Sequence, residues 1–228
     1  MSQESNLKKK TNSKESKTGN PVFPKYAVWL LIITCVSFGI TYTLSDFIPT
    51  GEYHLLAIPL DQRIPLWTPA VIVYILAYFQ WIFCAVIVMK QKRQICTGLF
   101  VSIISVFWIS FIIFLAFPTK TIRPEITGTG FCDTLLKYVY MVDAPTRICP
   151  SFHCILSWFC GRALFKCEGV PKREAWINMI FSVMVFASTL FTKQHVIIDL
   201  PVSIIVTEFG FLLSLLLHPY LQCSGSRR

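Results

Sequence analysis

Six stretches of the chain are dominated by apolar residues and are separated by short polar segments. They cover residues 26–44, 69–89, 95–117, 152–165, 177–191 and 196–217. A helix needs about 20 residues to cross the hydrocarbon layer of a bilayer. The first three stretches and the last are long enough, and we expect the fourth and fifth to extend into their polar flanks or to line a pocket. The pattern predicts an all-α protein built as a bundle of six transmembrane helices.

The composition agrees with this pattern. Of the 228 residues, 54% are hydrophobic and only 14% are charged, and the mean hydropathy is +0.58. A soluble domain of this size cannot hide so much apolar surface, so the composition favours an integral membrane protein. Residues 1–20 are polar and rich in lysine, which predicts a disordered basic tail in front of a membrane domain over residues 21–228. This tail lacks the apolar core of a cleavable signal peptide.

The basic residues are distributed unevenly between the two sets of connectors. If the N-terminus is cytoplasmic, fifteen of the 21 Lys and Arg residues lie on the inner side and six on the outer side. This excess favours a multi-pass protein of the plasma membrane with both termini in the cytoplasm. The outer connectors are then residues 45–68, 118–150 and 192–195. The net charge of +9 lies in short connectors instead of along one face, which argues against nucleic acid as a partner.

Three polar segments at the predicted outer ends of helices carry the candidate chemistry. They read F-P-T-K-T-I-R-P over residues 117–124, C-P-S-F-H over 149–153 and K-Q-H-V-I-I-D over 193–199. In a six-helix bundle these segments converge, and polar groups at a membrane boundary are costly unless they have a partner or a function. The pattern predicts an active site at the outer membrane face.

The residue types in these segments favour a phosphate ligand. Lys120, Arg123 and Lys193 supply positive donors, and arginine fits phosphate oxygens bidentately. Pro150 suits the first turn of a helix, with Ser151 beside it. The free N–H groups and the dipole of that helix favour an anion at the same place.

Two histidines and an aspartate complete the candidate site. His195 and Asp199 are four residues apart, so on a helical turn they share a face and the carboxylate can hold one imidazole nitrogen. The other nitrogen is then free as a nucleophile, and His153 is the acid that protonates the departing oxygen. Taken alone, Asp199 is equally typical of a helix cap.

At these positions the chain resembles the type 2 phosphatidic acid phosphatases, relatives of the vanadium haloperoxidases. The family's motifs run Lys-x6-Arg-Pro, Pro-Ser-Gly-His and Ser-Arg-x5-His-x3-Asp. The matching residues are Arg123 and Pro124; Pro150, Ser151 and His153, with Phe152 in place of the glycine; and Ser188, His195 and Asp199. The resemblance covers the third to sixth predicted spans. It implies an integral membrane enzyme that hydrolyses a lipid phosphate or diphosphate, of the phosphatidic acid, phosphatidylglycerophosphate or undecaprenyl diphosphate type.

The resemblance also implies a role for each matching residue. His195 attacks phosphorus to form a phosphohistidine, Asp199 orients it, and His153 protonates the leaving group. Arg123 and Ser151 hold the phosphate oxygens. Neither a metal nor a cofactor is required.

The chain departs from the family at two cations. The family's first lysine falls on Ala116, and Lys120 lies four residues later. The family's arginine in the third motif falls on Thr189, next to the matching Ser188, and Lys193 is the candidate substitute. We therefore expect Lys120, Lys193 and Ser188 to join the phosphate-binding residues.

Three other functions stay open from the residues alone. Cys149, His153, His195 and Asp199 are all competent zinc ligands, although the cations in the same loops would repel a metal ion. A lipid phosphotransferase, in which an alcohol accepts the phosphate, is the second alternative, because F-P-T-x-x-x-R-P resembles the first motif of inositol-phosphoceramide-synthase-like enzymes. The missing family cations also leave room for an inactive member that acts as a transporter or scaffold.

Two features outside these motifs carry weaker expectations. Cys132 and Cys149 share the long polar loop, which allows a disulfide between them. Glu208 lies nine residues after Asp199, about 180° around an ideal helix, so we expect it to face away from the site. It then pairs within the bundle or contacts another copy of the chain.

Overall fold

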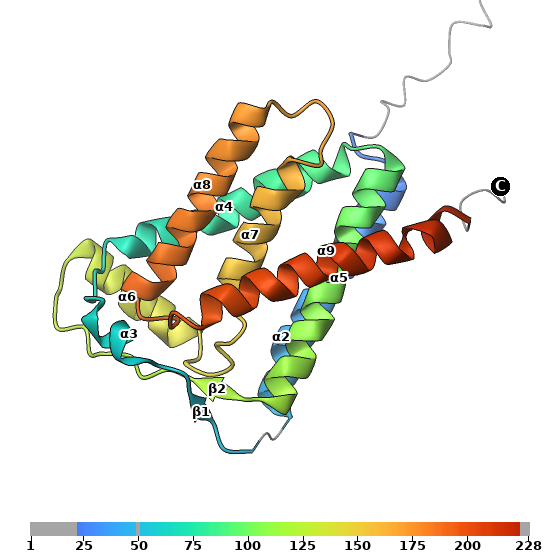
Figure 1. The fold of residues 1–228 in the computed structure, drawn as a ribbon. Coiled ribbons are helices and arrows are strands. Elements are labelled where there is room, and N and C mark those ends of the chain that lie inside the picture. Colours follow the sequence, from blue (N-terminus) through green and yellow to red (C-terminus); the bar gives the residue numbers. More distant parts are fainter. Residues whose placement is uncertain (1–21, 49–50, 224–228) are drawn as a thin grey trace, which may run out of the picture.

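The computed structural model describes residues 22–48 and 51–223, and within them the chain is all-helical apart from two very short strands (Figure 1). The elements are α2 (Lys25–Phe47), β1 (His54–Leu55), α3 (Pro59–Arg63), α4 (Ala70–Met89), α5 (Arg93–Ala116), β2 (Thr119–Lys120), α6 (Phe131–Val142), α7 (Phe152–Leu164), α8 (Lys172–Phe191) and α9 (Asp199–Cys223). The predicted disordered tail over residues 1–20 lies outside the described residues.

Five of the helices are long and apolar enough to cross a membrane. These segments are Lys25–Ser45, Ala70–Met89, Arg93–Ala116, Lys172–Phe191 and Asp199–Leu217. The predicted fifth span is therefore longer than its apolar run, because α8 begins in the polar flank at Lys172. The predicted fourth span behaves differently: α7 has 13 residues. At 1.5 Å per residue it is about 20 Å long, shorter than a hydrocarbon core of about 30 Å.

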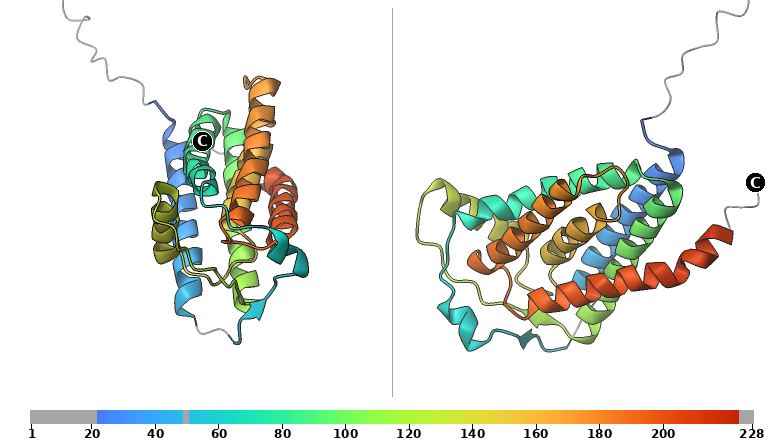
Figure 2. Two further views of the ribbon diagram at one scale, coloured as in Figure 1. Left: turned by 90° about the vertical axis from the view of Figure 1, so that its left-hand side faces the viewer. Right: turned by 45° about the horizontal axis from the view of Figure 1, so that its top comes forward.

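The short helix α7 lies in the middle of the bundle. It packs against α8, α4 and α9, while α5 packs against α2 and α9 (Figures 1 and 2). Helices α5 and α9 approach closely at Gly210, where an added Cβ would lie 2.3 Å from a methyl carbon of Val106 and 2.9 Å from the carbonyl oxygen of Ser102. A larger residue at this position would push the two helices apart.

The connections α2–α4, α5–α7 and α8–α9 meet at one end of the bundle (Figure 1). Strands β1 and β2 pair there in parallel and tie the first two connections together, with His54 opposite Thr119 and Leu55 opposite Lys120. The structure thus gathers at one end the three polar segments that the sequence singled out. The α4–α5 and α7–α8 connections lie at the other end, with basic residues such as Lys90 and Arg173.

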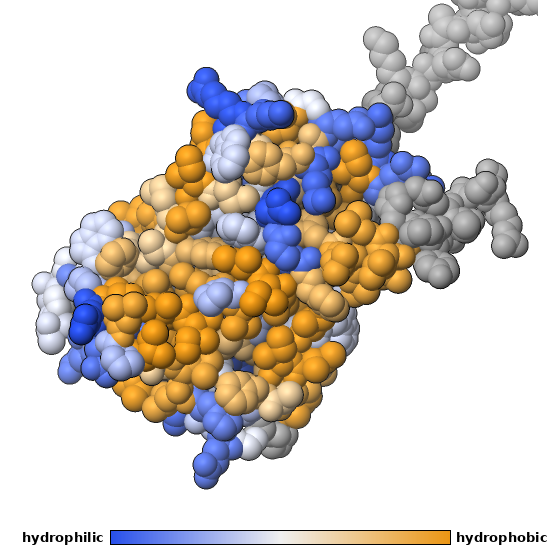
Figure 3. Space-filling model, viewed as in Figure 1, coloured by the Kyte–Doolittle hydropathy of each residue, from blue (hydrophilic) through white to orange (hydrophobic). Residues whose placement is uncertain are grey.

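Apolar side chains cover much of the face shown in Figure 3. Exposed examples come from all five candidate spans, including Ile33, Phe79, Ile112, Ile180 and Ile205. Monomeric soluble proteins rarely expose apolar patches of this extent. The surface therefore belongs to a protein embedded in a membrane.

Candidate active site

His195 and Asp199 lie at the turn between α8 and α9 and contact each other directly. Nδ1 of His195 is 3.0 Å from Oδ2 of Asp199, and the backbone N–H of Val196 donates to the same oxygen at 3.1 Å. The Asp199 side chain is fully buried and that of His195 is 10% exposed. Because the carboxylate holds Nδ1, Nε2 is the imidazole nitrogen left for chemistry. The predicted contact between these two residues is confirmed.

Hydrogen bonds to α3 and to the residue that follows it hold the turn that carries His195. Lys193 makes two of these hydrogen bonds. Nζ of Lys193 donates to the carbonyl oxygens of Asp61, at 2.8 Å, and Ile64. Oδ1 of Asp61 accepts the backbone N–H of Ile197 at 2.8 Å. Lys193 has a φ of 54°, and it is not among the residues that line the cavity described below. In this structure Lys193 positions the turn, and the prediction that it replaces a phosphate-binding arginine does not match its placement.

His153 occupies the first turn of α7, which Ser151 caps. Oγ of Ser151 accepts the backbone N–H of Cys154 at 3.3 Å, and the backbone N–H of Ser151 donates to Oγ of Ser203 at 2.9 Å. Ser151 is fully buried, so its hydroxyl serves the helix start. It was predicted to bind phosphate, and the structure gives this hydroxyl a capping role.

The His153 ring is held by three aromatic residues of α4. It stacks on Tyr74 with ring centroids 3.8 Å apart, and Tyr78 and Trp81 lie at 5.5 and 5.1 Å. Its Nε2 is buried and has no hydrogen-bond partner among the described residues. The imidazole is thus fixed in place while one ring nitrogen stays available.

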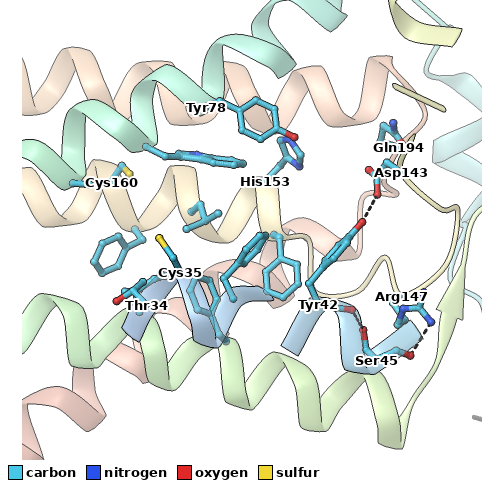
Figure 4. Close-up of a pocket in the computed structure, with 18 of the residues that line it drawn as sticks. Thr34, Cys35, Tyr42, Ser45, Tyr78, Asp143, Arg147, His153, Cys160 and Gln194 are labelled. Atoms are coloured by element: carbon cyan, nitrogen blue, oxygen red, sulfur yellow. Dashed lines mark hydrogen bonds between the residues drawn. The ribbon is translucent and has the colours of Figure 1, made fainter. Parts of the chain in front are cut away.

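A cavity of about 570 Å³ is lined by both His153 and His195. Figure 4 shows part of its lining, with His153 and Gln194 labelled. The cavity lies between α2 and α5 on one side and α4 and α7 on the other. Its polar end is lined by Arg123, Asp143, Arg147, His153, Gln194 and His195. The remainder is mostly apolar, with Phe38, Phe100, Phe107 and Leu156 in its wall. Lining residues on α2 and α4 are exposed on the outer surface, among them Cys35 and Ile82.

Arg123 reaches the polar end and is held by several acceptors. Its Nη1 donates to the carbonyl oxygens of Tyr140, at 3.2 Å, and Asp143, at 2.6 Å. Its Nη2 donates to the carbonyl oxygen of Ala144, at 3.4 Å, and to Oε1 of Gln194. The guanidinium also lies over the Tyr140 ring, 4.7 Å from its centroid. Burial lowers the pKa of Arg123 from its ordinary value, and the charge of Asp143 opposes this shift.

Two other predicted phosphate-binding residues do not line the cavity. Lys120 is exposed in β2, which pairs with β1, and it is not among the residues that line the cavity. Ser188 is buried in α8, where its hydroxyl donates to the carbonyl oxygen of Val185 at 2.7 Å. Thr189, at the place of the family's arginine, uses its hydroxyl in the same way on Phe186. The predicted approach of Lys120 and Ser188 to a common site therefore finds no support in the lining of this cavity.

Three residues that line the polar end were not among the predicted site residues. Nη1 of Arg147 donates to the carbonyl oxygen of Ser45 at 2.9 Å. The carboxylate of Asp143 accepts the hydroxyl groups of Tyr42, at 3.0 Å, and Tyr74, at 3.2 Å. Gln194 is the third, and its position directly before His195 is the signal that could have found it. No spacing rule marks the other two, because they reach the cavity through the long α5–α7 connection.

The alternative zinc site receives no geometric support. Within residues 22–48 and 51–223, no group of three or more His, Cys, Asp and Glu residues is arranged to hold a metal ion. Burial raises the pKa of the Cys149 thiol, and the nearby Asp199 charge adds to this, which disfavours the thiolate that zinc needs. Cys132 and Cys149 are both free thiols in this structure, so the disulfide that the loop allows is not formed.

Comparison with protein-family models, with curated proteins and with solved structures finds no significant match for the chain. The functional interpretation therefore rests on the geometry of the site and on the motifs.

Proposed function

We propose that this protein is a membrane-embedded lipid phosphatase that works through a phosphohistidine. One observation carries the proposal: His195, with its Asp199 partner, and His153 lie at the polar end of a single cavity whose remainder is apolar. A lipid phosphate has the same division, with one charged end and one apolar chain. The resemblance to the type 2 phosphatidic acid phosphatases supports the same chemistry.

In the proposed reaction each residue has one task. Nε2 of His195 attacks phosphorus, while Asp199 accepts a hydrogen bond from Nδ1–H and stabilises the positive charge that develops on the imidazole. The bond from phosphorus to the lipid oxygen breaks, and that oxygen takes a proton from His153. In the second half, His153 accepts a proton from water as the water attacks the phosphohistidine, which releases inorganic phosphate and restores both histidines.

The apolar part of the cavity supports a lipid substrate instead of a soluble one. Along α4 the lining runs from Tyr78 to Val88, ten residues or about 15 Å. This is about half the thickness of the hydrocarbon core. Cys35 on α2 and Ile82 on α4 line the cavity and are also exposed on the outer surface. We therefore propose that the lipid chain enters from the bilayer between these two helices.

The proposal includes six spanning helices, with α7 as the short fourth one, and an active site facing the outside of the plasma membrane. The basic residues near the α4–α5 and α7–α8 connections support this orientation, because positive residues are enriched on the cytoplasmic side. A cysteine introduced at Thr127, which is exposed, should react with an impermeant thiol reagent applied to intact cells. Labelling only after the cells are opened would place the site inside.

One observation favours a second candidate, a lipid phosphotransferase. The His153 and His195 side chains are largely shielded from solvent, being about one tenth exposed. Restricted access of water gives a bound alcohol the advantage in attacking the phosphohistidine. The two candidates share the first half of the reaction and differ in the acceptor.

The experiment that tests the proposal measures inorganic phosphate released by the purified protein from a panel of lipid monophosphates and diphosphates in detergent. We expect release that survives excess EDTA and is inhibited by vanadate, which mimics five-coordinate phosphorus. Transfer of phosphate to an added alcohol without release would favour the phosphotransferase. Loss of activity on chelation, restored by zinc, would favour the metal site. Inactivity on every lipid, with no transfer, would contradict the proposal.

A further inference from the structure

Gln194 is built into the same turn as His195. The backbone N–H groups of Gln194 and His195 both donate to the carbonyl oxygen of Thr189, at 3.1 and 3.2 Å. The side chain of Gln194 is buried, with 1% of the residue exposed, and it lines the polar end of the cavity. Any group at this end that reacts with His195 therefore lies close to the Gln194 amide.

The orientation of the Gln194 amide follows from its neighbour. Nη2 of Arg123 can only donate, and it donates to Oε1 of Gln194. The other end of the amide is therefore Nε2, which carries two N–H donors. This nitrogen is buried and has no hydrogen-bond partner among the described residues. Leaving a buried donor unpaired costs about 1–3 kcal/mol, so such an atom in a cavity wall calls for a ligand.

Two further buried nitrogens lack a hydrogen-bond partner within the described residues, as Nε2 of Gln194 does. Nε of Arg123 and Nε2 of His153 are also buried without a partner in the described part of the chain, and both residues line the same end of the cavity. Three residues from separate segments that line one end of the cavity thus each have a buried nitrogen whose hydrogen-bonding capacity is unused. Two of them, those of Arg123 and Gln194, are obligate donors, which suits an anion rich in oxygen.

The same end of the cavity contains Arg123 but lacks the two lysines that the sequence predicts there. Lys193 is committed to α3, Lys120 lies outside the cavity, and Thr189 stands where the resembling family has an arginine. A neutral amide that is held rigidly can supply part of the phosphate binding that was expected from these cations. Donors fixed before the reaction stabilise developing negative charge at no cost in reorganisation.

We propose that Nε2 of Gln194 donates a hydrogen bond to a non-bridging oxygen of the phosphate and that Arg123 holds the amide in the donating orientation. Gln194 is then a catalytic residue that stabilises the five-coordinate transition state at phosphorus. This inference rests on the proposed function, because it assigns a contact within the same site. It also specifies the ligand class as a tetrahedral oxyanion with at least one unsubstituted oxygen.

The test compares Gln194→Met with wild type in two measurements: kcat for phosphate release and the dissociation constant of orthovanadate. Met has a similar length and no donor, so we expect kcat to fall about 100-fold, as for removal of one oxyanion donor, and vanadate to bind more weakly. Gln194→Glu is the second variant. It keeps an acceptor for Arg123 but places a negative charge near the phosphate, so the loss should be larger.

Gln80→Met is the matched control. Gln80 is a buried glutamine whose Nε2 donates to Asn178 and to Ser182, at 2.9 Å each, and it does not line the cavity. Its replacement should lower the melting temperature and leave the vanadate affinity unchanged. A merely structural role of Gln194 would give the same result in Gln194→Met, with vanadate affinity and kcat retained in the folded fraction, and would overturn the inference.

The outcomes separate this inference from the proposed function. If wild type hydrolyses lipid phosphates and both Gln194 variants match it in kcat and vanadate affinity, the inference is wrong and the function stands. If wild type binds vanadate but hydrolyses no lipid phosphate, the function is wrong, and weaker vanadate binding by the variants still supports the contact. If wild type does neither, both are wrong. If Gln194→Met does not fold, Gln194→Glu decides by the same criteria.

Discussion

Helix α9 carries two carboxylates whose surroundings differ. At Glu208 every oxygen has a partner: Oε1 accepts from Nε1 of Trp158, at 2.9 Å, and Nε of Arg162, at 2.7 Å, and Oε2 accepts from Nη2 of Arg162 at 3.1 Å. Asp199 is fully buried and holds His195, and the cavity beside this pair has three buried nitrogens with no partner among the described residues.

The comparison separates a structural ion pair from the pair that we propose to be reactive. Glu208 joins α9 to α7 through contacts that are complete within the chain, which confirms that it pairs within the bundle. Buried polar atoms in native proteins are nearly always paired, and three of the seven unpaired ones in the described residues belong to residues that line this end of the cavity, which supports the proposal that a ligand binds there. Changes at the two carboxylates should therefore affect different properties.

The largest effect is expected for His195→Ala. Without the nucleophile, phosphate release should fall by at least about 10⁴-fold, as for loss of a member of a catalytic triad. The protein should stay folded, because His195 contributes one side-chain contact. Measurement of phosphate release beside the melting temperature checks both points. Residual turnover above about 1% of wild type would contradict the role of His195.

Asp199→Asn should come next. The amide is nearly isosteric with the carboxylate and can still accept the backbone N–H of Val196. It no longer supplies the charge that orients His195 and stabilises its positive form, so we expect kcat to fall by about 10²–10⁴-fold. Steady-state kinetics of the folded variant measures this. Unchanged kcat would show that Asp199 is only a helix cap.

His153→Ala should give a loss that depends on the leaving group. An alkoxide needs the proton that His153 donates, so turnover of a lipid alkyl phosphate should fall by about 10²–10⁴-fold. A p-nitrophenolate leaves with little help, so an aryl phosphate should be affected much less. The ratio of the two activities in the variant is the measurement. Equal losses of activity on both substrates would show that His153 is not the general acid.

Glu208→Gln should have the smallest effect on turnover. The Arg162 partner is partly exposed, so we expect a loss of about 1 kcal/mol in the free energy of unfolding. Activity at a temperature where the variant is folded should match wild type. Thermal unfolding followed beside activity checks this pair of outcomes. Loss of activity without loss of stability would contradict the assignment of a structural role to Glu208 and a catalytic role to Asp199.

The sequence predicted local relations better than distant ones. The contact of His195 with Asp199 follows from a spacing of four residues, and five of the six predicted spans appear as helices long enough to cross a bilayer. The fourth is short because α7 is enclosed by other helices. A buried helix satisfies its backbone internally and can be apolar without spanning the bilayer alone.

Side-chain direction was the part that sequence could not supply. Lys193 lies two residues from His195, yet its backbone conformation sends it to the carbonyl oxygens of α3. Lys120 lies in β2, which pairs with β1, and does not line the cavity, whereas Arg147 reaches the cavity from far along the same connection. Each of these outcomes depends on a contact between segments that are distant in the chain, which motif spacing does not encode.

The central claim is that phosphate is carried on His195, and one measurement tests it directly. The protein is mixed with a labelled lipid phosphate, quenched rapidly under alkaline conditions that preserve phosphohistidine, digested, and mapped by mass spectrometry. The account predicts phosphate on His195 in wild type and no labelled peptide in His195→Ala. Turnover with phosphate on another residue, or with none on the protein at any time during the reaction, would contradict it.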